Sequence, residues 1–364
     1  MIAIFCETPY QLLNALNLVY SEFREECVLY VMKDMFKSNV RFDINVKNKG
    51  YIKSVKEVRR DTYKISFFSR ALSKLYGIVA GHKKRIIRRH ITNVNLKERY
   101  DKFICIKYSF AASLVYDYMK EKPEVYQVEE GIGEYLLLND FDYADNKNNI
   151  CNHVKCKYIS EPRLYPRADK FNLKKSPYLS TDMEFTDLLE NIFHYRKELP
   201  LYKRYIYFGQ AFAQDYENPE FENIEGNCFK IFAEILDYDD LSIKKHPRNT
   251  SDICDEFGSI HTLAPWECCI NELDDIENRV IISISSTALI TPKLMCDKEP
   301  YLIVLAKLYA KELKKIYTER NYYDKLIELF EQVKVLYRDS NKVFIPESMD
   351  ELKTILKQQE GENL

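Results

Sequence analysis

Residues 1–23, MIAIFCETPYQLLNALNLVYSEF, contain the structural unit that the rest of the chain repeats. The first six residues are all apolar, which indicates a buried strand. Thr8 and Pro9 then supply an N-cap and a first-turn proline for a helix over residues 10–23. A second apolar run at residues 27–32 predicts the next strand. This strand–helix–strand order is typical of parallel sheets covered by helices.

The same alternation continues in two series along the chain. The first series predicts further strands at residues 55–58, 103–107 and 125–129, with helices at 66–90, 111–120 and 181–197. The second predicts strands at 205–208, 241–245, 280–284 and 301–305, with helices at 219–236, 266–273 and 288–296. Residues 139–180 are rich in Asn, Asp, Lys and Pro, which predicts a polar excursion outside the core.

We therefore predict an α/β fold of two facing Rossmann-like domains with parallel sheets. The N-terminal domain covers residues 1–198 and the C-terminal domain residues 199–345. Residues 346–364 form a terminal helix that is expected to pack back on the N-terminal domain.

Composition excludes several classes of protein. The 54 basic and 56 acidic residues give a net charge of -2, which argues against a chain that coats nucleic acid. The N-terminus lacks the features of a signal peptide, and no run of about 18 uncharged apolar residues is present. We expect a cytoplasmic protein without a membrane span. Only nine of the 364 residues are glycine, so we expect each glycine where the backbone needs a positive φ or a close approach.

The sequence offers no convincing metal site. The ten cysteines are scattered through apolar contexts, which predicts reduced core residues. Cys151, His153 and Cys156 form a compact group, but no second pair of ligands follows at zinc-site spacing. The Asp-x-Asp motifs at residues 140–142 and 237–239 do not follow clear strands. We therefore expect neither a metal nor another cofactor.

An acidic turn follows the predicted strand that ends near residue 128. Glu129 and Glu130 precede Gly131 and Gly133, which would let the backbone turn sharply beside a ligand. Either carboxylate could act as a general base. An ordinary solvated acidic turn explains the same residues equally well.

A histidine follows the strand that begins at residue 241. Lys245, His246, Pro247 and Arg248 are consecutive, so proline restrains the backbone after the imidazole while two cations flank it. Ligands of open parallel sheets bind at the carboxyl ends of strands. This combination therefore favours binding of an anionic phosphate over a purely structural histidine.

Two further polar turns follow strands of the second series. Ser285, Ser286 and Thr287 open a predicted helix, where hydroxyls and free backbone N–H groups favour an anion. An ordinary N-cap would use the same residues. Gly209 and Gln210 follow the strand at residues 205–208, with Asp215 close behind as a candidate base or as ordinary loop polarity.

Six stretches, in this order, resemble bacterial sialyltransferases of glycosyltransferase family 52, which includes lipooligosaccharide sialyltransferases. They are TPYQLLNAL from residue 8, EVYQVEEGIGEYL from 124, YFGQAFAQD from 207, KKHPRN from 244, LAPWECC from 263 and SISSTALIT from 283. Each stretch is short, so the likeness rests on their order and spacing.

The resemblance implies a GT-B fold and a metal-independent, inverting transfer from CMP-sialic acid to a galactose-type hydroxyl of a bacterial surface glycan, with α-2,3 linkage. It places His246 and the hydroxyls of Ser285, Ser286 and Thr287 on the phosphate of the donor, and Glu267 on the ribose. The base would be Glu129, Glu130 or Asp215. The likeness further implies a homodimer. We also expect peripheral contact with the inner face of the cell membrane.

Two alternatives stay open at this point. A transferase of the same family could use another sugar nucleotide. A protein of another class could use the basic stretch at residues 82–90 to bind nucleic acid or an anionic membrane surface.

Overall fold

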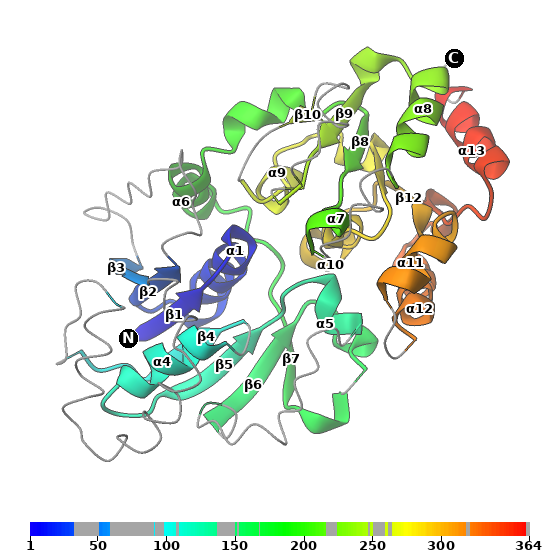
Figure 1. The fold of residues 1–364 in the computed structure, drawn as a ribbon. Coiled ribbons are helices and arrows are strands. Elements are labelled where there is room, and N and C mark those ends of the chain that lie inside the picture. The colour runs from blue at the N-terminus through cyan, green and yellow to red at the C-terminus, as the bar shows by residue number, and fades with distance from the viewer. Residues whose placement is uncertain are drawn as a thin grey trace. The chain divides into compact units, whose positions relative to one another are not determined.

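The computed structural model divides the chain into two compact units (Figure 1). The first unit comprises Met1–Glu130 and Asn139–Phe193, and the second Gly131–Leu138 and His194–Leu364. The structure describes residues 1–32, 51–58, 91, 98–106, 109–136, 150, 153–166, 168–215, 224–246, 248–249, 259–260, 264–317 and 321–361. Most of the predicted helix at 66–90 with its basic stretch, the motif at 140–142, Cys151 and Pro247 lie outside these residues.

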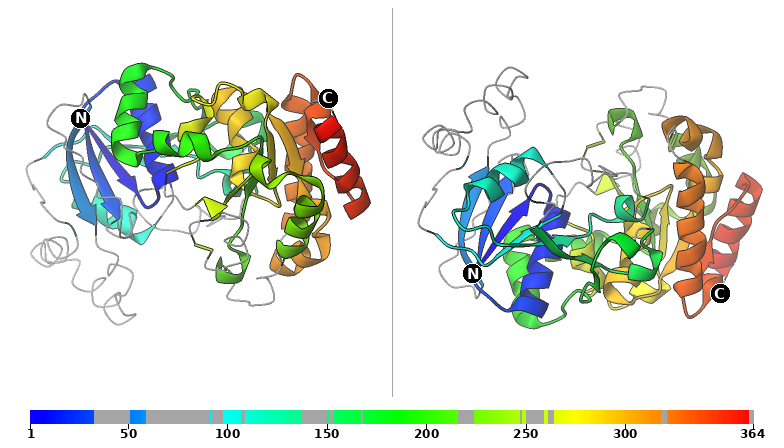
Figure 2. Two further views of the ribbon diagram at one scale, coloured as in Figure 1. Left: turned by 90° about the horizontal axis from the view of Figure 1, so that it is seen from above. Right: turned by 90° about the horizontal axis from the view of Figure 1, so that it is seen from below.

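The first unit contains a seven-stranded parallel sheet in the order β3-β2-β1-β4-β5-β6-β7. The strands are β1 Ile2–Cys6, β2 Cys27–Met32, β3 Ile52–Val58, β4 Lys102–Cys105, β5 Glu124–Val128, β6 Val154–Ile159 and β7 Leu173–Lys175. The blue strands in Figure 2 are β1 and β2, which pair in parallel from Ile2 beside Cys27. The predicted parallel sheet is confirmed.

The prediction of a polar excursion at residues 139–180 is wrong from residue 154 onward, because this part supplies β6 and β7. Cys156 and Tyr158 are buried in β6, and so is Lys157 between them. Lys157 Nζ lies 4.8 Å from the ring centroid of Tyr165 and 3.2 Å from its hydroxyl. A lysine that looks solvated in the sequence is thus accommodated by an aromatic neighbour.

Helices of the first unit begin at the residues that the sequence marks. Thr8 caps α1, Pro9–Leu18, by accepting a hydrogen bond from the Gln11 amide at 3.2 Å. A π-helical turn, Val19–Phe23, follows and ends at Arg24 in the left-handed conformation. The other α-helices among the described residues of this unit are α4, Phe110–Tyr118, and α6, Met183–Phe193.

The second unit contains a six-stranded parallel sheet in the order β10-β9-β8-β11-β12-β13. The strands are β8 Tyr205–Phe208, β9 Leu241–Lys244, β10 Ser259–Ile260, β11 Val280–Ser283, β12 Tyr301–Val304 and β13 Val343–Phe344. Numbered within the unit, this order is 3-2-1-4-5-6, which is the Rossmann arrangement. The strand order reverses between β8 and β11, so these two strands form the switch point of the sheet. The predicted Rossmann-like second half is confirmed.

The described part of the second unit contains eight α-helices. They are α5 Ile132–Leu136, α7 Phe212–Asp215, α8 Gly226–Ile235, α9 Glu267–Ile270, α10 Thr291–Cys296, α11 Ala310–Ile316, α12 Tyr322–Leu336 and α13 Met349–Gly361. The terminal helix α13 packs on α8 of its own unit, where Lys353 Nζ lies 3.0 Å from Glu234 Oε2 (Figure 1). The expectation that it packs on the N-terminal domain is therefore wrong, because its buried residues, including Leu352 and Leu356, belong to the core of the second unit.

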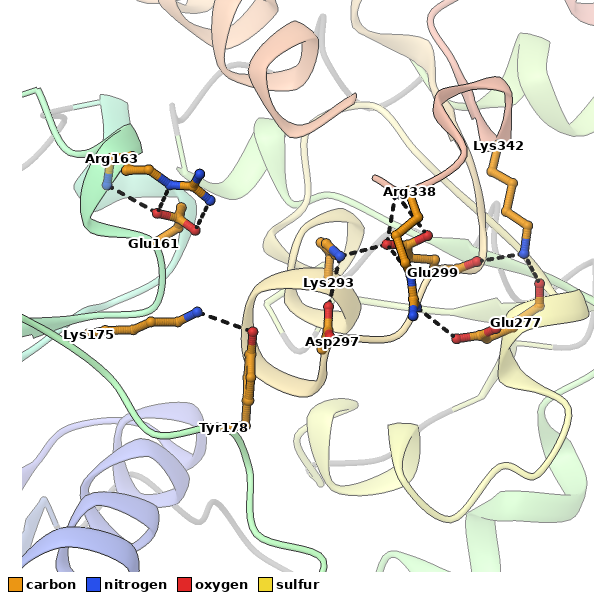
Figure 3. A network of polar contacts seen from close by, with 10 residues as sticks. All are labelled: Glu161, Arg163, Lys175, Tyr178, Glu277, Lys293, Asp297, Glu299, Arg338 and Lys342. Carbon is orange, nitrogen blue, oxygen red and sulfur yellow. Dashed lines mark hydrogen bonds and ion pairs between the residues drawn. The ribbon is translucent and has the colours of Figure 1, made fainter. Parts of the chain in front are cut away.

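A charged network fixes the end of the chain in the second unit (Figure 3). Buried Glu299, just before β12, accepts from Lys293 Nζ at 2.6 Å and from the Arg338 backbone amide at 3.0 Å. Burial raises its pKa, but these partners outweigh burial and hold the pKa of Glu299 below its usual value. Lys342 Nζ donates to the carbonyl oxygens of Glu277 and Glu299 at 3.1 and 3.0 Å. Figure 3 also draws a pair of the first unit, Arg163 and Glu161.

The cysteines behave as the sequence predicts. Every cysteine in the described ranges is free, and all of these except Cys296 are buried. The same ranges include no helix with both the length and the apolar character that crossing a bilayer requires.

Candidate functional site

The switch point of the second unit brings two predicted polar turns together. Gly209 and Gln210 follow β8, and Gln210 Nε2 donates to Ser283 Oγ, the last residue of β11, at 3.1 Å. Ser283 Oγ in turn donates to the carbonyl oxygen of Phe208 at 2.6 Å. Ligands of open α/β sheets bind outside the carboxyl ends of strands at such a reversal. The turns that the sequence singled out for position therefore lie where this fold binds ligands.

The hydroxyl residues after β11 have different surroundings. Ser286 Oγ accepts from the Ala288 amide at 3.2 Å and so caps the 3₁₀ turn Thr287–Leu289. Ser285 is buried, and its Oγ makes no hydrogen bond of normal geometry with the described residues. Tyr317, which the sequence did not single out, lies close by. Burial raises the pKa of the Tyr317 hydroxyl, while Ser285 opposes this rise.

His246 lies beyond the end of β9 with one ring nitrogen engaged. The backbone amide of Arg248 donates to His246 Nδ1 at 3.1 Å, which leaves Nε2 to carry the proton of the neutral ring. Burial, and then the nearby Arg248 guanidinium, lower the pKa of His246 to about 4. The free protein therefore presents a neutral imidazole that can donate from Nε2 at neutral pH.

Asp215, a candidate base, is paired with Arg248. Its two carboxylate oxygens accept from Arg248 Nε and Nη2 at 2.7 and 2.8 Å. The two side chains are 35% and 62% exposed, so the pair lies at the rim of the site. The pair connects the end of α7 to the turn that carries His246. This bidentate contact engages the oxygens that a general base would need.

Glu267 lies in a buried charged group below β9. It is the first residue of α9, and burial raises its pKa to about 7 while Lys244 opposes the rise. Lys244 Nζ lies 3.7 Å from Glu198 Oε2, and burial lowers the pKa of this lysine. Lys245, which was predicted to bind the donor, is also buried. Glu198 could not be found from the sequence, because its contact with Lys244 joins distant parts of the chain.

The acidic turn is divided between the two units. Gly131 belongs to the second unit and has a φ of +100°, and a Cβ there would lie 2.7 Å from Thr287 Cγ2. The Ile132 amide donates to Thr287 Oγ1 at 3.2 Å, and α5 packs on α12. The predicted boundary at residue 198 therefore misses this segment. Position 131 requires glycine because its φ is positive and because Thr287 leaves no space for a Cβ. Gly133, in contrast, lies within α5.

Glu129 and Glu130 belong to the first unit and differ in their contacts. Glu129 is buried, and its two oxygens accept from the amide and the hydroxyl of Ser160 at 2.7 and 2.6 Å. These bonds connect the ends of β5 and β6. Glu130 Oε1 accepts from Gln11 Nε2 of α1 at 3.0 Å. Gln11 lies within the quoted TPYQLLNAL stretch, but the sequence alone gave it no role.

No group of three or more His, Cys, Asp or Glu side chains among the described residues could hold a metal ion. His153 and Cys156 of the compact Cys–His group are described, and Cys156 is a buried residue of β6.

Comparisons with known proteins give a limited result. No protein-family model matches the sequence, and no curated protein matches it. Among solved structures, the E. coli heptosyltransferase WaaC with ADP is 11% identical, with a TM-score of 0.46 and coverage of 100% of both chains. The glycotransferase of kitacinnamycin is 11% identical with a TM-score of 0.44, covering 98% of both chains.

Phytolacca americana UGT2, complexed with UDP-2fluoro-glucose and pterostilbene, is also 11% identical. Its TM-score is 0.42, and the match covers 98% of this chain and 100% of that one. All three TM-scores lie below 0.5, a level at which structural likeness is no evidence of a shared activity.

Proposed function

We propose that this chain is an inverting glycosyltransferase of the GT-B class that transfers sialic acid from CMP-sialic acid to a galactose-type hydroxyl of a bacterial surface glycan. One observation carries the proposal. Three polar turns that resemble the donor-binding motifs of family 52 follow β8, β9 and β11, at and beside the switch point of one Rossmann-like sheet. The choice of CMP-sialic acid rests on the resemblance of these motifs.

The chemistry of the second unit suits a donor with a single phosphate. His246 can donate from Nε2 to a phosphate oxygen, and Ser285 and Ser286 supply hydroxyls at the end of β11. Transfer expels CMP, so the developing charge on its phosphate must be stabilised or protonated. We assign that role to His246. Because a monophosphate carries little charge, we propose that transfer needs no metal.

An acceptor hydroxyl needs a base, and the contacts rank the three candidates. Both oxygens of Glu129 are engaged by Ser160, and those of Asp215 by Arg248. Glu129 is best explained as a link between β5 and β6. Glu130, which Gln11 orients, and Asp215, whose partner Arg248 is exposed, stay the two candidates for the base.

The test is release of CMP from CMP-sialic acid by the purified full chain with a panel of galactosides. We expect acceptor-dependent release that EDTA leaves unchanged and that His246→Ala abolishes. Parallel reactions with other sugar nucleotides decide the donor. If CMP-sialic acid is inert while another nucleotide turns over, the sialic acid assignment is wrong.

A second set of variants identifies the base. Changing Glu129, Glu130 or Asp215 singly to the amide should leave CMP binding intact, while the change at the base lowers kcat by about 10²–10⁴-fold. Equal and mild losses at all three positions would show that the base is another residue.

A further inference from the structure

Glu225 is a buried carboxylate that the chemistry above does not use. It directly precedes α8 and is 6% exposed. Its surroundings are apolar enough that burial raises its pKa to about 7. A carboxylate is costly in such a place, and an apolar residue would fill the same volume at lower cost. Its presence therefore calls for an explanation from its contacts.

The Glu225 carboxylate binds the turn that follows β8. Glu225 Oε1 accepts from the Gln210 backbone amide at 2.8 Å and from the Tyr207 hydroxyl at 2.9 Å. Its other oxygen, Oε2, lies 3.7 Å from the point where Gly209 would carry a Cβ. One side chain thus binds Tyr207 of β8 and the Gln210 amide, and lies beside Gly209.

Gln210 is fixed from two more directions. Its carbonyl oxygen accepts from Asn249 Nδ2 at 2.7 Å, in the segment that also carries His246. Its side-chain amide reaches Ser283 at the end of β11. Glu225 therefore fixes the backbone of the residue whose side chain reaches from β8 to β11 across the switch point. Moving that backbone amide would shift the Gln210 side chain away from β11.

We propose that Glu225 is a positioning residue of the donor site, whose carboxylate sets the Gly209–Gln210 turn in the shape that binds the nucleotide. This inference rests on the proposed function for its donor, and on the contacts above for the turn. Glu225 does not touch the donor; it acts through Gln210.

The test compares four versions of the full chain by calorimetric titration with CMP. Glu225→Ala removes the acceptor, and we expect roughly tenfold weaker CMP binding, since a buried amide loses its partner. Glu225→Gln keeps Oε1 and should stay within about threefold of the wild type. Tyr207→Phe is the matched control, because it removes the other bond to Oε1 and leaves the Gln210 amide held.

Hydrogen exchange of peptides covering residues 208–215 supplies a readout that does not depend on the ligand. Exchange at the turn should quicken in Glu225→Ala but not in Glu225→Gln or Tyr207→Phe. If the alanine variant fails to fold, Glu225→Asp, whose shorter side chain withdraws the carboxylate from the turn, takes its place.

The outcomes test the role of Glu225 and the identity of the donor separately. Unchanged CMP binding and unchanged exchange in folded Glu225→Ala would overturn the inference. Equal weakening in Glu225→Ala and Tyr207→Phe would also overturn it, because it would show a general loss of packing. If the wild type binds no CMP, the proposed donor is wrong, and exchange alone decides whether Glu225 holds the turn.

Discussion

Donor binding should be coupled to uptake of one proton by His246. In the free protein the pKa of this imidazole is about 4, because it is buried beside Arg248. Asp215, the other charged neighbour, only partly offsets these effects. At neutral pH the ring is therefore uncharged before the phosphate arrives. An anion that contacts Nε2 favours the charged form and raises the pKa.

The size of the effect follows from Coulomb attraction. Two unit charges about 4 Å apart attract by about 4 kcal/mol at an effective dielectric constant near 20. At about 1.4 kcal/mol per pKa unit, this corresponds to a rise of at most about three units, to a bound pKa no higher than about 7. The added proton goes to Nδ1 and displaces the hydrogen bond from the Arg248 amide, which offsets part of the rise. Between the free and the bound pKa, affinity increases as the pH falls. From pH 7.5 to 5.5 the dissociation constant should therefore decrease by up to roughly 20-fold.

The assay is calorimetric titration with the methyl ester of CMP. This phosphodiester keeps one negative charge, whereas the second ionisation of a free phosphate, near pH 6, would obscure the result. Titrations at pH 6 in two buffers of different ionisation enthalpy count the protons taken up. His246→Asn is the control, since its amide oxygen can accept from the Arg248 backbone while the Nε2 position is lost. The reasoning is refuted if the wild type takes up no proton, or if the asparagine variant keeps the same dependence on pH.

Three changes test other parts of the second unit. The pKa of Glu267 is about 7 in the folded protein, above its usual 4.5. The protonated carboxyl therefore stabilises the folded state at low pH by up to about 3 kcal/mol. This stabilisation is lost as the pH rises from about 4.5 through 7. Urea unfolding at pH 5 and 8 should show a smaller loss of stability for Glu267→Gln than for the wild type; an identical loss would contradict the assignment. Gly131→Ala should cost about 1–3 kcal/mol by urea unfolding, with Thr287→Ala recovering only the steric part, and no cost would show that the positive φ is not strained. Arg248→Ala should change stability by less than about 1 kcal/mol but raise the pKa of His246 in an NMR titration, and a fixed pKa would mean that burial acts alone.

The sequence predicted both sheets because strands of a parallel sheet are buried on both faces and appear as apolar runs. YIYF at Tyr205–Phe208 and VIIS at Val280–Ser283 are such runs, and both form central strands. The rule failed for VKCKYI at Val154–Ile159, where lysines interrupt the apolar pattern. Only the folded chain shows that Tyr165 lies near Lys157 and makes its burial tolerable.

The candidate site was predictable in its positions but not in its contacts. Residues after a strand must lie at the carboxyl edge of the sheet, so His246 and Ser285 could be placed from the sequence. Their partners depend on which strands are neighbours. Ser160 reaches Glu129 because β5 and β6 pair, and nothing in a polar segment some thirty residues downstream indicates this contact. Glu225 was missed for the same reason.

The proposal of a donor with a single phosphate agrees with three basic groups among the described residues at the end of β9. Arg248 is engaged by Asp215, and Lys244 lies beside Glu198, so both cations have acidic partners before a donor binds. The imidazole of His246 is neutral in the free protein. Among these three described groups, His246 is the one that gains a positive charge, when it takes up a proton, and that charge can balance one phosphate. A diphosphate would need a second positive charge. If Arg248 supplied it, the ion pair with Asp215 would break, and the Asp215 carboxylate would then face the same anion.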